Sequence, residues 1–287
     1  MRHRKNVGAI HVGLALAGAA ALAGVVAGPI TRPLAAQAQG RLNPAIAALE
    51  QGRPALSGES WSFFDMEHGA FQMDRLSGFL ERTAKERDAA GRLKVAPLVR
   101  IPTEGDEDFK WAIKQVLDQG VLGVLIPHVD TGEEAAHLVK AMRYPRRKES
   151  MLQEPRGLRG WGPRRAASYW GLTQDEYYDK ADVWPLNPNG ELLAIAMIES
   201  GEAVGNIEDI LRAPGLSAIL VVPGDLSIDL GLGPRGPKPF PEIEEAFQAV
   251  AKACRAQTAV VCGLADARSN LQKRLDEGWR FILQLGG

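Results

Sequence analysis

Cysteine is scarce in this sequence, with only Cys254 and Cys262 among 287 residues. Two cysteines cannot build the disulfide framework of a small secreted domain. The chain also has no CxxC pair and no Cys/His cluster with the spacing of zinc ligands. We therefore expect both cysteines to be ordinary core residues.

An excess of charge of either sign is also absent. Lys and Arg total 34 against 35 Asp and Glu, which gives a formal net charge of -1. Such a balance creates no global field for nucleic acid or an anionic membrane. Hydrophobic residues make up 45% of the chain, enough to bury a substantial core in one large domain or two ordinary ones.

The N-terminus differs from the rest of the chain. Residues 2–5 read "RHRK", and a run rich in Ala, Gly, Val and Leu follows, with no charged residue before Arg32. A small-x-small site, Ala36-Gln37-Ala38, ends this segment. These parts predict a secretory signal peptide over residues 1–38, and therefore a periplasmic protein. The alternative is an uncleaved N-terminal membrane anchor, because the apolar run is long enough to span a bilayer.

Beyond residue 40, short apolar runs alternate with amphipathic segments. Most of the apolar runs are continuous, as expected for strands covered on both faces. Alternating strands and helices imply a parallel sheet, and eight strands indicate a (β/α)8 TIM barrel over residues 41–287. The expected strands are 54–58, 61–66, 95–101, 123–129, 192–198, 217–223, 259–265 and 280–285, and the expected helices are 71–90, 106–119, 132–142, 202–212, 240–256 and 266–277.

Two joints depart from an ideal barrel. Only two residues separate the first two expected strands, too few for a crossover helix, and two glycines are all that follows the eighth. We expect a barrel that lacks its first and last helices, either incomplete or covered by a partner subunit.

Residues 143–190 form one long irregular stretch that holds all four tyrosines. Its arginines and aromatics alternate with Pro, Gly and acidic residues, and no nucleic-acid motif occurs. A loop of this length indicates a lid or an interface element.

Charged residues gather where the expected strands end, which is where a TIM barrel carries its active site. Two carboxylates at adjacent strand ends, Glu199 and Asp225, could share a hard divalent cation such as magnesium or manganese. The alternative is that each of these carboxylates is simply a solvent-exposed residue at the end of its strand. No lysine ends a strand, which disfavours Schiff-base chemistry. The remaining charged residues of these ends are Asp65, Glu67, His68, Arg100, His128 and Asp130.

Seven motifs together identify a resemblance that none of them carries alone. In chain order they are "FFDMEHGAF", "PLVRIP", "KQVLDQGVLGVLIPHVDTGEEA", "RYP", "RGWGPRRAASYWG", "MIESGEAVGNIEDIL" and "VPGDLSIDLG". From about residue 42 to the end, the chain resembles the HpcH/HpaI aldolase and citrate lyase family. That family consists of (β/α)8 barrels, usually oligomeric, that cleave or form carbon–carbon bonds through a pyruvate-type enolate on a divalent metal.

The resemblance implies a role for each matching residue. Glu199 and Asp225 match the metal ligands, His68 matches the general acid/base, and Arg100 matches the arginine that stabilises the oxyanion. Asp118 matches the carboxylate that raises the basicity of the histidine.

It also implies a substrate site. Gly224 stands where a backbone amide meets the substrate carboxylate, and Asp65 and Glu67 are expected to orient His68 or line the pocket. Two positions depart from the family: Met197 replaces a glutamine that touches substrate, and Val222 replaces the glycine that begins a "GPxDL" motif.

The function that these residues imply is a metal-dependent aldolase acting on 4-hydroxy-2-oxo acids, with small 2-oxo acid and aldehyde partners and a homo-oligomeric state. One alternative is a catalytically silent barrel that binds a small carboxylate. The other is a citrate-lyase-like acyl-CoA lyase, which the "DMEHG" motif disfavours.

Overall fold

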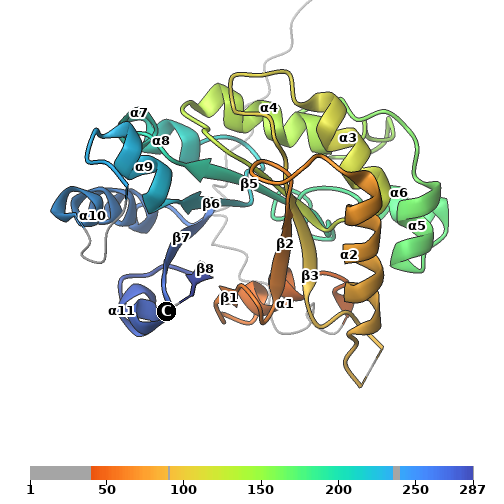
Figure 1. The fold of residues 1–287 in the computed structure, drawn as a ribbon. Helices are drawn as coiled ribbons and strands as arrows, with labels where there is room; N and C mark the ends of the chain where they lie inside the picture. Colours follow the sequence, from red (N-terminus) through yellow and green to blue (C-terminus); the bar gives the residue numbers. More distant parts are fainter. Residues whose placement is uncertain (1–39, 90, 235–239, 287) are drawn as a thin grey trace, which may run out of the picture. The chain divides into compact units, whose positions relative to one another are not determined.

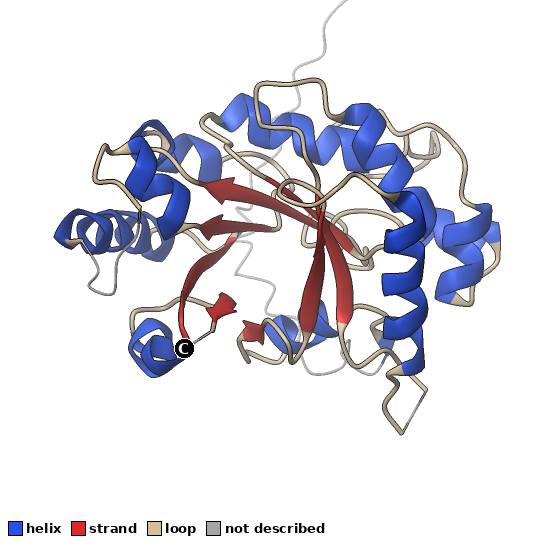
Figure 2. Ribbon diagram, in the orientation of Figure 1, coloured by secondary structure: helices blue, strands red, loops and turns tan. Residues whose placement is uncertain are grey.

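The computed structural model describes residues 40–89, 91–234 and 240–286, so the predicted signal peptide lies outside the described residues. Eight parallel strands form the centre of this part of the chain, and helices cover their outer side (Figures 1 and 2). The strands are β1 (Ala55–Leu56), β2 (Trp61–Asp65), β3 (Ala96–Arg100), β4 (Gly123–Ile126), β5 (Leu193–Ile198), β6 (Ala218–Val221), β7 (Val261–Ala267) and β8 (Phe281–Leu285).

The strand order is that of a (β/α)8 barrel. Each strand from β2 to β8 pairs with the next in parallel, and β8 pairs with β1. All eight expected strands are present within a few residues of their predicted ends. Every residue of β3, β4, β5 and β6 is buried, which explains why these strands read as unbroken apolar runs.

The barrel is nearly closed between β1 and β2, the first and last strands in the sheet order; we call this junction the seam. Only one parallel bridge, Ser57 to Trp61, connects this pair, and residues 57–60 between the strands form a turn, which confirms that no helix joins them. Trp61 lies fully buried across the seam. Its ring stacks on Phe281 of β8 at a centroid distance of 4.4 Å, and its indole N–H donates to the carbonyl of Ala55 in β1. One aromatic side chain therefore packs together three strands.

The helices match the predicted segments, with additions. Thr131 and Glu134 form the expected reciprocal capping box at the start of α4. The segment expected as one helix over 202–212 is two short helices with Asn206 between them. The helices are α1 (Pro44–Glu50), α2 (Met73–Lys85), α3 (Lys110–Gln119), α4 (Gly132–Met142), α5 (Arg164–Trp170), α6 (Gln174–Lys180), α7 (Gly201–Gly205), α8 (Ile207–Leu211), α9 (Pro223–Asp229), α10 (Pro241–Arg255) and α11 (Leu271–Asp276), the last preceded by a 3-10 turn (Arg268–Asn270).

The stretch over 143–190 is less irregular than expected, because it contains α5 and α6. Its fully buried guanidinium, Arg143, donates through Nε and Nη2 to both carboxylate oxygens of Asp182, at 2.7 and 3.2 Å. Arg143 also donates to the carbonyls of Leu152 and Pro155. One buried ion pair thus connects the start of the segment to a residue near its end.

The two cysteines form a disulfide, which corrects the expectation that they are ordinary core residues. Cys254 lies near the end of α10 and Cys262 near the start of β7, with Cα atoms 6.2 Å apart. This separation falls in the normal range for a disulfide. The bridge joins α10 to the strand that follows it in the chain.

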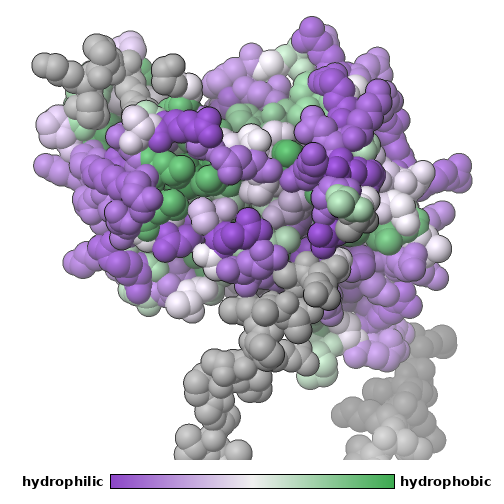
Figure 3. Space-filling model, turned by 90° about the horizontal axis from the view of Figure 1, so that it is seen from below, coloured by the Kyte–Doolittle hydropathy of each residue, from purple (hydrophilic) through white to green (hydrophobic). Residues whose placement is uncertain are grey.

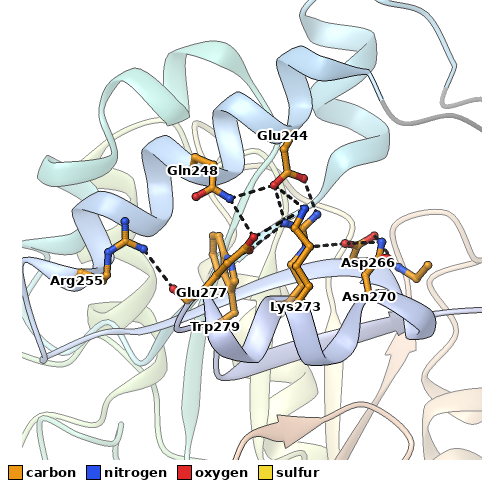
Figure 4. A network of polar contacts seen from close by, with 10 residues as sticks. Glu244, Gln248, Arg255, Asp266, Asn270, Lys273, Glu277 and Trp279 are labelled. Atoms are coloured by element: carbon orange, nitrogen blue, oxygen red, sulfur yellow. Dashed lines mark hydrogen bonds and ion pairs between the residues drawn. The ribbon is translucent and has the colours of Figure 1, made fainter.

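A network of polar contacts ties together α10, α11 and β7 (Figure 4). Arg274 donates to three carboxylates: Asp266 at 2.7 Å, Glu244 at 2.8 Å and Glu277 at 2.9 Å. Lys273 adds a second cation beside Glu244 at 3.0 Å. The network fixes α11 against the barrel on one side of the seam.

Among the described residues, no helix combines the length and the hydropathy that crossing a bilayer requires.

Candidate active site

Arg100 is the centre of an ion-pair cluster at the ends of β2 and β3. Asp65 and Arg100 are direct neighbours in the strand register. The guanidinium donates to both oxygens of Asp65, at 2.9 and 2.6 Å, and its Nη1 lies 2.6 Å from Oε2 of Glu67. Although burial acts in the opposite direction, the bonds from Arg100 hold the pKa of Asp65 below its usual value. Asp65 and Glu67 therefore hold Arg100 in place.

His68 lies beside this cluster and faces water. Its side chain is 62% exposed, and its Nε2 lies 3.8 Å from Oε2 of Glu67. Glu67 thus lies within ion-pair distance of both Arg100 and His68. An exposed imidazole next to a fixed cation can exchange protons with a bound molecule or with water.

Glu199 follows β5 and is completely buried. The backbone N–H of His128 donates to its Oε2 at 2.8 Å, while its Oε1 is buried without a hydrogen-bond partner. Burial raises the pKa of Glu199 to about 7, and the nearby charges of Asp225 and Glu67 act in the same direction. A buried carboxylate oxygen without a donor is a position that a cation would satisfy.

Gly224 and Asp225 lie in the first turn of α9, which begins at Pro223 shortly after β6. They lie on the wall of a cavity of about 320 Å³ that also reaches His68, Arg100 and Met197. No heavy atom lies within 4 Å of the point where a Cβ of Gly224 would stand, so the backbone there is open to a bound molecule. Five of the predicted site residues thus line one cavity: His68, Arg100, Met197, Gly224 and Asp225. Glu199 lies beneath them, close enough to Asp225 for their charges to interact.

These residues fit a hard divalent cation. Glu199 and Asp225 offer carboxylate oxygens, which magnesium and manganese prefer, and two protein ligands leave positions for water and substrate. The part of the chain that the structure describes contains no group of three or more His, Cys, Asp or Glu side chains able to hold a metal.

The structure places Asp118 away from His68. Asp118 lies on α3, and its Oδ1 accepts a hydrogen bond from Nη2 of Arg159 at 2.8 Å. Arg159 is buried, with its guanidinium 4.4 Å from the ring centre of Tyr144. Within one chain, Asp118 therefore holds the 143–190 segment on α3 instead of assisting the histidine. Among the described residues that line the cavity, none comes from that segment.

Sequence reasoning noted His128 at a strand end but gave it no role. In the structure its N–H fixes Glu199, and its Nε2 lies 4.0 Å from the same carboxylate oxygen. The only sequence signal was its place directly after Ile126-Pro127, where a polar residue follows a buried strand.

Comparisons with known proteins agree on one family. A family model described as HpcH/HpaI aldolase/citrate lyase matches residues 51–286. A hydroxypyruvate/pyruvate aldolase from Delftia acidovorans is 32% identical, over 79% of this chain and 74% of that protein. A 2-keto-3-deoxy-L-rhamnonate aldolase from Escherichia coli K12 is 31% identical over the same shares.

Solved structures show the same relationship. An HpcH/HpaI aldolase/citrate lyase family protein from Burkholderia cenocepacia J2315 superposes with a TM-score of 0.64. It is 28% identical, and the match covers 80% of each chain.

Proposed function

Because this chain belongs to the HpcH/HpaI aldolase/citrate lyase family, we propose that it is a metal-dependent aldolase that forms and cleaves 4-hydroxy-2-oxo acids through a pyruvate-type enolate. The observation that carries the proposal is the Oε1 atom of Glu199, which is buried and has no hydrogen-bond partner. Glu199 lies close enough to Asp225 for their charges to interact, and Asp225 lines the same cavity as His68 and Arg100. Small 2-oxo acids and aldehydes are the substrates that this chemistry implies.

Each residue of the candidate site has a role in this proposal. Glu199 and Asp225 would hold the cation, which when bound supplies positive charge for the developing enolate. Arg100, fixed by Asp65 and Glu67, adds a second positive charge on the cavity wall. His68, exposed at the rim, moves the proton directly or through water. The open backbone at Gly224 leaves room for the substrate carboxylate.

Deuterium exchange into pyruvate tests the first half of the reaction without knowledge of the aldehyde. With magnesium in D2O, the wild-type protein should remove the methyl proton signal of pyruvate in NMR spectra. His68→Ala should slow this exchange by about a hundredfold or more, because a general base contributes about 10²–10⁴ to the rate.

Measurements of metal affinity distinguish the role of His68 as a base from the roles of Glu199 and Asp225 as metal ligands. Calorimetry with manganese should find His68→Ala close to wild type, whereas Glu199→Ala and Asp225→Ala should each abolish binding. A wild-type protein that binds manganese and pyruvate but exchanges no protons would be the catalytically silent barrel instead. Unchanged manganese affinity in both carboxylate variants would overturn the metal site.

We propose further that the protein acts outside the cytoplasm, in keeping with the predicted signal peptide over 1–38. The disulfide Cys254–Cys262 supports this location, since disulfides persist mainly in oxidising compartments.

A homo-oligomer remains our prediction, because apolar surface gathers on one face among hydrophilic stretches (Figure 3). In the 143–190 segment, which we expected to be a lid or an interface element, most large aromatic side chains are buried or half-buried within the chain. Tyr144 and Tyr177 are buried within the chain, and Trp170 is only 8% exposed, whereas Trp161 is 56% exposed.

A further inference from the structure

The cavity between the catalytic groups is mainly apolar. His68, Arg100 and Asp225 contribute its charged side chains, and the proposed chemistry already uses all three. No hydroxyl or amide side chain is found among the described residues that line it. The remaining lining residues are Phe63, Leu125, Met197, Leu220, Val222, Pro223, Gly224, Ala265, Leu283 and Leu285.

The cavity has a buried floor and a half-buried rim. Leu125, Met197, Leu220 and Ala265 come from four neighbouring strands and are at most 2% exposed. The rim side chains are partly accessible: Phe63, Val222, Leu283 and Leu285. Apart from His68, Arg100 and Asp225, a ligand that enters past the rim therefore meets only apolar side chains and the backbone of Gly224 among the described lining residues.

Part of the cavity wall comes from the end of β8, which extends further than β1. β1 pairs with β8 only through Ala55 and Leu56, which lie opposite Phe281 and Ile282. Leu283 and Leu285 continue β8 beyond that point and have neighbours on β7 but none on β1. Phe63 lies on β2 across the same seam. Directly after β1, Ser57 accepts hydrogen bonds from the backbone N–H and the side-chain amide of Gln284, whereas Leu283 and Leu285 line the cavity.

The geometry points to an aldehyde partner with an apolar alkyl or aryl substituent rather than a polyhydroxylated one. This inference rests on the proposed aldolase function and specifies its second substrate. Burial of an apolar substituent against these walls removes it from water and stabilises the complex. A sugar-like chain would instead lose hydrogen bonds to water that these walls cannot replace. A volume of about 320 Å³ accommodates a small ligand.

Competing aldehydes provide the test. With magnesium and saturating pyruvate, kcat/KM for aldol addition should be at least about tenfold higher with hexanal or benzaldehyde than with glyceraldehyde, since pocket discrimination of this kind is worth about 10–200-fold. Leu285→Asn and Leu283→Asn place an amide on the wall, and each should reduce the ratio. The control Ile228→Asn alters an apolar residue that is 56% exposed on α9 and should keep the ratio.

The outcomes separate the two proposals. Pyruvate exchange with equal or reversed aldehyde preference would overturn the apolar pocket and leave the aldolase intact. Absence of pyruvate exchange would overturn the proposed function, and calorimetry would still test the pocket: 2-oxo-4-phenylbutyrate should bind at least about tenfold more tightly than pyruvate. Equal affinity of the two acids would contradict the inference.

Discussion

A single backbone conformation at His128 positions the most buried carboxylate of the site. His128 has φ = 48°, in the left-handed region that non-glycine residues rarely adopt. This conformation directs its N–H to Oε2 of Glu199 at 2.8 Å. Strained backbone of this kind costs of the order of 1–3 kcal/mol and is concentrated at functional sites. The histidine thus has a positioning role that does not depend on its ring.

Substitutions at residue 128 should distinguish the contribution of its backbone N–H to manganese binding from that of its imidazole ring. Asn tolerates a positive φ, so His128→Asn should bind manganese nearly as wild type does. Val does not, so His128→Val should lose the bond to Glu199 and weaken manganese binding about tenfold or more, because a bond to a charged group contributes about 1.5–3 kcal/mol. Calorimetry measures both. Equal losses in the two variants would assign the role to the imidazole.

At this scale the sequence predicted the types of residue better than their contacts. Glu199, Asp225, His68 and Arg100 gather as expected, because parallel strands end at one rim. The partner of Asp118 could not be predicted, since Arg159 reaches it from a segment 41 residues away that carries no strand periodicity.

At the scale of elements, the Arg274 network holds α10, α11 and β7 together by charge. The hydrogen bond from Arg274 lowers the pKa of Glu244 to about 2, with further help from Lys273 and Gln248. A carboxylate with a lowered pKa in the folded state stabilises the fold above its unfolded pKa of about 4.5. That contribution is lost as pH falls toward about 2, when the folded-state carboxylate takes up its proton.

Glu244→Gln should therefore destabilise the protein in a pH-dependent way. At pH 7 its melting temperature should be lower than that of wild type, and the gap should narrow as pH falls from 4.5 toward about 2. Thermal unfolding followed by circular dichroism measures the gap. The control is Glu242→Gln, an exposed residue on the same helix. A gap that is constant with pH would show that Glu244 contributes packing rather than charge.

Elements were predictable where burial imposes a pattern. The strands read as continuous apolar runs because helices cover them, whereas α5 and α6 were missed. Each has only seven residues, and the sequence around them is rich in charge, proline and glycine, so no apolar period stands out.

For the whole molecule, the barrel could be predicted from the order of its elements, but its closure could not. Strand-helix alternation leaves few other arrangements. Trp61 stacks on Phe281, which lies 220 positions later in the chain, and a contact between such distant residues cannot be predicted from a local sequence pattern. The disulfide was missed for a related reason: a spacing of eight residues does not show whether two Cα atoms lie 6.2 Å apart.

The disulfide and the N-terminal segment lead to one prediction about the whole protein. Expressed with its own N-terminus in a Gram-negative host, the protein should lose residues 1–38, appear in the periplasmic fraction, and resist thiol alkylation until it is reduced. A variant without residues 2–38 should stay in the cytoplasm and react at both cysteines at once, because thiols there are kept reduced. Mass spectrometry of the two fractions, before and after alkylation, measures processing and redox state together. Full-length protein in the membrane fraction would instead support the anchor, and free thiols in the periplasmic form would contradict the link between location and disulfide.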